Sequence, residues 1–185
     1  MSNKTNRYKG FIVGALGGVV GVMAMDGYWK AVVSITGRDP REASVPKNKK
    51  AQALDDISVV GKQHKEGEGS TEAVGRIAFE AVTGKEPRTK ETSKALSTEV
   101  HWAFGMSAAA LYGALRGSAR WPDVLGGVAL GVGLWGLGDE LAVPLLGLAG
   151  GPTSSPPELH AYTLGAHIAY GLAAAAVAQV LDKVG

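Results

Sequence analysis

The stretch that decides the fold class is residues 159–181, which read LHAYTLGAHIAYGLAAAAVAQVL and contain no Asp, Glu, Lys or Arg. A helix that crosses a lipid bilayer needs about 20 consecutive, mainly apolar residues. Residues 159–181 meet that requirement without help from their neighbours. The first prediction is therefore a membrane-spanning helix at this position.

Three further stretches lack charged side chains but are shorter: residues 10–25, 100–115 and 124–138. Each reaches a spanning length only if it includes a flanking polar residue. The sequence therefore predicts an all-α integral membrane four-helix bundle, a single domain over residues 1–185. Its spans are predicted at about 9–27, 96–116, 122–147 and 158–181, with a long polar segment at about 30–94 between helices one and two. A soluble all-α domain with an unusually apolar core is the alternative.

Charge is unevenly distributed along the chain. Of its 36 charged residues, 27 lie in residues 1–94. The net charge of +2 is too small to indicate a nucleic-acid-binding protein. The chain has no cysteine, which excludes disulfides and thiolate metal sites. It also has no nucleophile elbow and no Walker loop, so the sequence predicts no enzyme and no cofactor.

Apart from those in the long polar segment, the Lys and Arg residues that flank the predicted spans lie on one side of the membrane. They precede the first span, separate the second from the third and follow the fourth, as Lys4, Arg7, Lys9, Arg116, Arg120 and Lys183. The connection at 150–158 has neither residue type. The positive-inside rule then places both termini in the cytoplasm, because the long segment 27–94 translocates regardless of its charge. The alternative for the first span is a cleaved signal peptide.

Within the polar segment, residues 71–83 carry the pattern of an amphipathic helix. Val74, Ile77, Ala78 and Ala81 share one face, and Gly84 follows as a stop signal. We expect this helix to lie on the bundle or on the bilayer.

Glycine spacing indicates close helix packing. Small residues four positions apart let helix backbones approach in lipid, where packing replaces the hydrophobic effect. The predicted packing positions are Gly14, Gly18, Gly105, Gly127, Gly131 and Gly171.

The chain also contains an internal repeat. Residues 101–111, HWAFGMSAAAL, match residues 167–177, HIAYGLAAAAV, at six of eleven positions. The preceding helices match more weakly, through glycines and an aspartate with the same spacing. We interpret this as two parallel two-helix repeats related by an axis along the membrane normal. Shared membrane composition is the competing explanation.

Five polar residues fall at similar depth in the outer part of the predicted membrane: Asp26, His101, Asp139, Glu140 and His167. A sixth, His160, lies nearer the outer surface on the same helix face as His167. Ionisable groups at this depth are costly and mark functional candidates. Three interpretations stay open. The groups form hydrogen bonds that fix the bundle, they exchange protons or bind a cation near neutral pH, or some of them bind a metal or haem.

Several of these residues carry a family resemblance. The pattern comprises His101 with Phe104-Gly105 and Tyr112-Gly113, Asp139-Glu140 with Pro144 and Gly147-Leu148, His160, and His167 with Tyr170-Gly171. It resembles the YagU-like family of small bacterial inner-membrane proteins, whose biochemical activity is not established. The resemblance implies a multi-pass protein of the bacterial inner membrane. At Asp139-Glu140 the chain departs from the family, whose better-known members carry His or other polar residues there.

The sequence thus favours an outward-facing cluster in which Asp139 and Glu140 accept protons or a cation, while His101 and His167 relay. The expected partners are the lipid bilayer and either a second copy of the chain or another membrane protein. A structural or accessory membrane subunit is the main alternative function.

Overall fold

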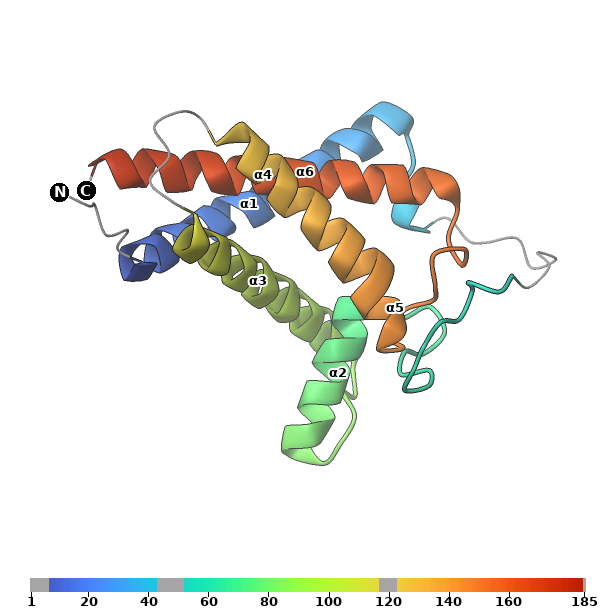
Figure 1. Ribbon diagram of the computed structural model, residues 1–185. Helices are drawn as coiled ribbons and strands as arrows, with labels where there is room; N and C mark the ends of the chain where they lie inside the picture. The colour runs from blue at the N-terminus through green and yellow to red at the C-terminus, as the bar shows by residue number, and fades with distance from the viewer. Residues whose placement is uncertain (1–6, 43–51, 117–122, 185) are drawn as a thin grey trace.

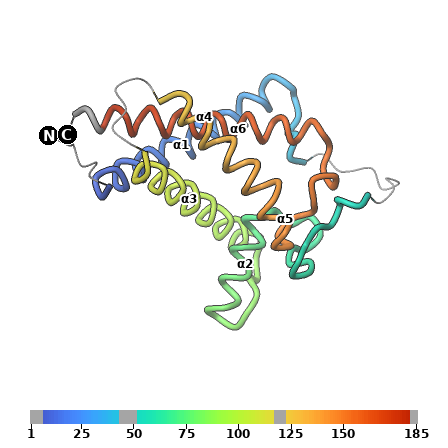
Figure 2. Tube along the Cα trace, in the orientation of Figure 1, coloured from blue at the N-terminus to red at the C-terminus, as the bar shows by residue number. Residues whose placement is uncertain are grey.

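The computed structural model describes residues 7–42, 52–116 and 123–184, and within these ranges every regular element is helical (Figure 1). The elements are α1 (Arg7–Thr36), η1 (Pro40–Glu42), α2 (Ser70–Thr83), α3 (Lys90–Leu115), α4 (Val124–Gly133), η2 (Leu134–Ala142), α5 (Val143–Leu145) and α6 (Pro157–Val184). The predicted all-α class is confirmed. The start of α1 and the end of α6 lie at the same end of the bundle (Figure 2).

Three helices are long and apolar enough to cross a membrane: Arg7–Thr36, Val124–Leu145 and Pro157–Leu181. They coincide with three of the four predicted spans and indicate a multi-pass membrane protein. The other predicted span, 96–116, lies within α3. This helix begins earlier, at Lys90, and its first turns carry Glu91, Lys94 and Glu99. A crossing by α3 therefore stays a prediction.

Helix α1 is the centre of the bundle. It packs against α3 on one side and α6 on the other, and α4 lies on the far side of α6. The contacts run through glycines four residues apart: Gly10, Gly14 and Gly18 face α3, and Gly17 and Gly21 face α6. A Cβ atom at Gly14 would overlap the carbonyl oxygen of Ala109. The helices approach closely because these positions carry no side chain.

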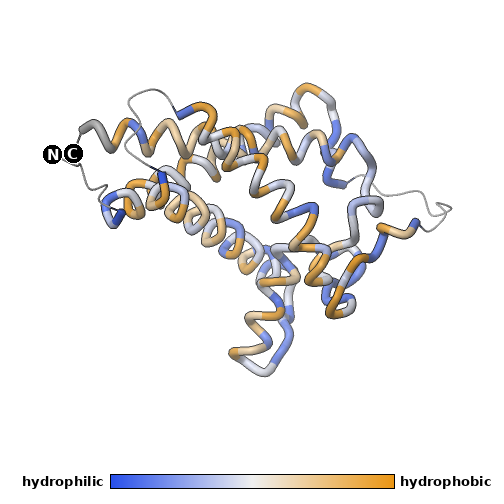
Figure 3. The backbone as a smooth tube through the Cα atoms, in the orientation of Figure 1, coloured by the Kyte–Doolittle hydropathy of each residue, from blue (hydrophilic) through white to orange (hydrophobic). Residues whose placement is uncertain are grey.

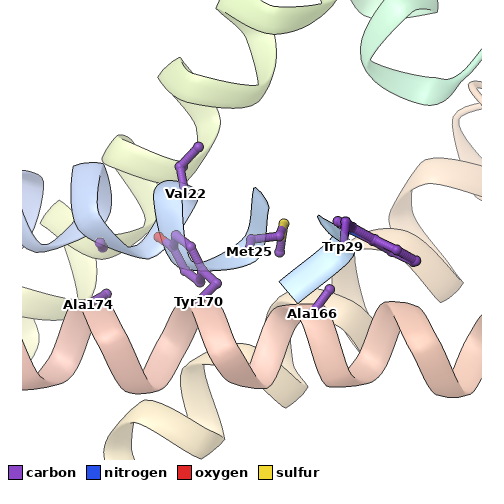
Figure 4. Close-up of a cluster of buried hydrophobic side chains, with 7 residues drawn as sticks. Val22, Met25, Trp29, Ala166, Tyr170 and Ala174 are labelled. Carbon is purple, nitrogen blue, oxygen red and sulfur yellow. The ribbon is translucent and has the colours of Figure 1, made fainter. Parts of the chain in front are cut away.

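Small residues fill the interior and large apolar residues face outward. Ala109, Ala166 and Ala174 are almost completely buried, whereas Phe11 and Leu125 are exposed. Figure 4 shows Tyr170 of α6, the largest almost completely buried side chain, reaching toward α1. Figure 3 shows apolar residues along the length of α4 and α6. This distribution suits a bundle surrounded by lipid, where apolar side chains need no burial.

The two helix pairs of the predicted repeat are both antiparallel, but their registers differ. Gly14 opposes Ala109 in the pair α1–α3, whereas Gly127 opposes Gly171 in the pair α4–α6. In the sequence alignment Gly171 corresponds to Gly105, one helical turn from Ala109. All six glycines predicted to pack helices lie at close backbone or side-chain contacts. Duplication itself stays a prediction.

The described part of the polar segment folds back on the end of the bundle where α5 lies. The backbone N–H of Val59 donates to Leu145, and that of Gln63 donates to Gly147. The predicted amphipathic helix is confirmed as α2, which packs against α3 and ends at Gly84 with a φ of 69°. Residues with a Cβ atom rarely adopt this left-handed conformation, which explains why a glycine ends the helix.

A buried ion pair anchors α2. Arg76 Nε lies 2.7 Å from Glu68 Oε1, and the two side chains are 12% and 8% exposed. The Arg76 guanidinium also donates to the Gln63 carbonyl at 2.6 Å. Hydrogen bonding to Arg76 lowers the pKa of Glu68 from its ordinary value of 4.5.

We expect acid to loosen this anchor. Because the folded-state pKa of Glu68 is depressed, its stabilisation is present above about pH 4.5 and is lost as pH falls through the lower folded value. Arg76→Ala should loosen α2 by about 2 kcal/mol at neutral pH. Amide hydrogen exchange across residues 62–86 measures this. Lys65→Ala, which breaks the exposed pair with Glu86, should have little effect, and equal exchange in both variants would contradict the account.

Candidate functional site

The carboxylates Asp139 and Glu140 lie on a π-helical stretch, η2, that interrupts the apolar helix α4–α5. The backbone N–H of Val143 donates to Gly138, five residues earlier, which is the π-helical spacing. Pro144 has no N–H, and its ring would crowd the carbonyl of Glu140 in a regular α-helix. Gly136 and Gly138 make the wider turn easier. Such stretches often occur at functional sites.

Glu140 pairs with His160 of α6. His160 Nδ1 lies 2.6 Å from Glu140 Oε1, and both side chains are mostly buried. His160 Nε2 is buried and has no hydrogen-bond partner among the described residues. The pair joins η2 to α6 and leaves one ring nitrogen available to a small polar molecule.

Asp139 pairs with His167, one level deeper on α6. His167 Nε2 lies 3.5 Å from Asp139 Oδ2. The other ring nitrogen, Nδ1, lies 2.9 Å from the Thr163 carbonyl oxygen. A carbonyl only accepts, so Nδ1 must carry a hydrogen. Contact between Nε2 and the carboxyl group is then favourable only when one further proton lies on either partner. Nε2 is therefore the ring atom that faces the Asp139 carboxyl group, and the pair has a place for one proton.

His101 of α3 completes this level of the bundle. Its charged neighbours are Asp26, Asp139 and His167, which come from α1, η2 and α6. Helix α3 therefore contributes one titratable group to the same set. The structure brings together five of the six predicted residues as two carboxylate–histidine pairs with His101 beside the inner one.

Asp26 lies apart from these pairs. It is on an exposed face of α1 and lines a separate hollow with Trp29, Lys30 and Arg41. Arg41 stacks over the Trp29 ring at 4.8 Å and binds Asp39 at 2.7 Å. Asp26 is near enough to His101 for their charges to interact. No hydrogen bond joins the two side chains among the described residues.

Two adjoining cavities connect the pairs. The inner cavity, of about 210 Å³, is lined by His101, His167 and Asp139. The outer cavity, of about 230 Å³, is lined by Glu140, His160 and Asp139. Asp139, Ser70 and Thr163 line both. Asp139 is 43% exposed, so its carboxylate is accessible at the junction of the two cavities.

A metal site receives no support from the geometry. Across residues 7–42, 52–116 and 123–184, no group of three His, Asp or Glu side chains comes close enough to hold one ion. The candidate ligands His101, His167, Asp139 and Glu140 are therefore arranged as pairs and not as a ligand shell.

Sequence reasoning missed the residues that enclose the site. Ser70 and Thr71 begin α2 and line the inner cavity, and Thr71 bonds Ser97 of α3 at 2.8 Å. Tyr170 donates to the Gly105 carbonyl at 2.5 Å and forms the cavity floor. The repeated aromatic–glycine pairs signalled Tyr170 and Gly105, but no local pattern signalled the docking of α2.

Comparison with known proteins yields no relatives: no family model, no curated protein and no solved structure matches this chain. The functional argument therefore depends on the geometry of the two pairs and cavities.

Proposed function

We propose that this chain is a multi-pass protein of the bacterial inner membrane, similar to the YagU-like proteins, that exchanges protons with the external side. Asp139 and Glu140 accept the protons, and His167, His160 and His101 hold or relay them. The observation that carries the proposal is the Asp139–His167 pair, in which Nδ1 is committed to Thr163 and Nε2 faces the carboxyl group. We infer that this contact holds one exchangeable proton.

The proposed topology has four crossings with both termini in the cytoplasm. Helix α3 is included because its apolar part, residues 100–115, packs along α1 through Gly105 and Gly113. The pairs then lie toward the outer surface, at the end of the bundle covered by the polar segment. A proton from outside would reach Glu140 and His160 first, and then Asp139.

The second candidate is a structural or accessory subunit in which the pairs only fix helix packing. The short His160–Glu140 contact, which joins α6 to η2, favours it. Gly133 and Gly136 have open space beside them on α4 and η2. A second copy or another membrane protein would pack there, because small residues allow close helix approach in lipid.

An external pH step distinguishes these functions. In proteoliposomes, tryptophan fluorescence should change when the outside is moved from about pH 8 to about pH 5, because Trp29 lines the same cavity as His167 and Asp139. The double variant Asp139→Asn, Glu140→Gln should lose this response. Glu158→Gln is the matched control, since Glu158 pairs with Arg38 outside both cavities.

An unchanged response in the double variant would refute proton exchange at the pairs. A response equally lost in Glu158→Gln would show that the fluorescence reports another titration. Native mass measurement then tests the accessory function, for which a stoichiometric membrane partner is expected.

A further inference from the structure

The inner cavity has walls that suit an organic cation. Three aromatic side chains line it: Trp29 from α1, Phe104 from α3 and Tyr170 from α6. Val22, Met25 and Leu134 add apolar surface. Aromatic faces attract quaternary and other organic ammonium groups through the ring quadrupole. The lining of the cavity is therefore mainly apolar and includes three aromatic rings.

One negative group faces this surface. Asp139 is the acidic residue among the described residues that line the inner cavity. The charged and titratable groups around it are Glu140 on its own element, His167 on α6 and His101 on α3, and Asp26 on α1 acts on His101. Tyr170 also faces the cavity. Loss of the shared proton leaves a carboxylate at the cavity wall.

The residues around the cavity do not form a metal site. Among the described residues, no group of three His, Asp or Glu side chains comes close enough to hold one ion, whereas alkaline-earth ions need six or more oxygen ligands. A volume of about 210 Å³ is below the range for drug-sized ligands. The fitting molecule is small, largely apolar and singly positive.

The geometry points to a binding site for a small organic ammonium cation in the inner cavity, occupied in exchange for the proton shared by Asp139 and His167. This inference rests on the proposed proton exchange at Asp139. The exchange balances: the cation enters, one proton leaves to solvent and the net charge of the site is unchanged. Phe104 and Trp29 contact the methyl groups of the ammonium, and Asp139 supplies the opposite charge.

Choline is the probe that tests this site. The full chain in maltoside detergent, which carries no ammonium headgroup, is titrated with choline by calorimetry. Binding should tighten from about pH 5 to about pH 8, because protons compete for Asp139. It should release about one proton per chain at the acid end of this range and progressively less as the pH rises. The uncharged isostere 3,3-dimethylbutan-1-ol should not bind. Binding seen only with choline-headgroup lipid vesicles would assign the same chemistry to a lipid headgroup.

Three variants assign the binding to the cavity. Asp139→Asn should weaken choline binding about tenfold or more, and Phe104→Leu about fivefold. Phe11→Leu is the matched control, because Phe11 is an exposed aromatic of α1 away from the cavity. Phe104 is 58% exposed, so its replacement leaves the interior packing intact.

No saturable choline binding, equal binding of the uncharged isostere, or affinity unchanged in Asp139→Asn would overturn the inference. Preference for inorganic phosphate over choline would also overturn it, because the site would then bind anions and not cations. Proton exchange is measured separately without choline. If exchange is present and choline does not bind, this inference alone fails; if exchange is absent, the proposed function fails.

Discussion

Gly14→Leu should prevent assembly of the native bundle. The new side chain would meet the backbone of Ala109 and Ala110, which cannot move without separating α1 from α3. Overpacking usually costs about 1–3 kcal/mol, and we expect at least the upper end because the obstacle is backbone. Thermal unfolding and size-exclusion profiles in detergent measure the loss.

Gly133→Leu is the matched control for this prediction. It makes the same substitution in an apolar helix, at a glycine with open space around it. We expect near wild-type stability. Equal behaviour of the two variants would contradict the assigned packing of α1 on α3.

The helices were predictable because the signal is local. The charge-free stretch 159–181 predicts α6, and the glycine spacing of α1 predicts close contacts. The outward extension of α3 to Lys90 was not predictable, because its charged first turns are stabilised by packing against α2. A contact between segments that each appear polar leaves no periodic pattern in the sequence.

Five of the six predicted site residues lie together in the structure, and Asp26 lies apart from them. Asp26 follows Gly18 and Val22 at a spacing of four, which would direct it toward α3. In the structure α3 leaves α1 in the direction of α2 (Figure 1), and Asp26 is exposed. The π-helical turn was also missed. Gly136, Gly138 and Pro144 lie in or beside it, and its two carboxylates pair with histidines of α6 that are distant in the sequence.

Asp139→Asn should move proton uptake by the chain to lower pH within the range from about pH 8 to about pH 5, because asparagine has no negative charge to stabilise a proton at the contact with His167. Potentiometric titration of the purified chain and the variant measures the difference. Superimposable titration curves would contradict proton exchange at this pair.

The central claim is that one proton moves at the contact between His167 Nε2 and Asp139. Nitrogen-15 NMR of the histidine-labelled chain tests it most directly, because it reports the hydrogen on each ring nitrogen as pH changes. The account predicts that His167 Nδ1 keeps its hydrogen throughout, held by the Thr163 carbonyl, while Nε2 gains and loses one. It also predicts that Asp139→Asn changes the nitrogen-15 signal of His167 Nε2 and leaves the ring signals of His64, which bonds Gly147, unchanged. Loss of the Nδ1 hydrogen from His167, or an Nε2 signal that is identical with and without Asp139, would contradict the claim.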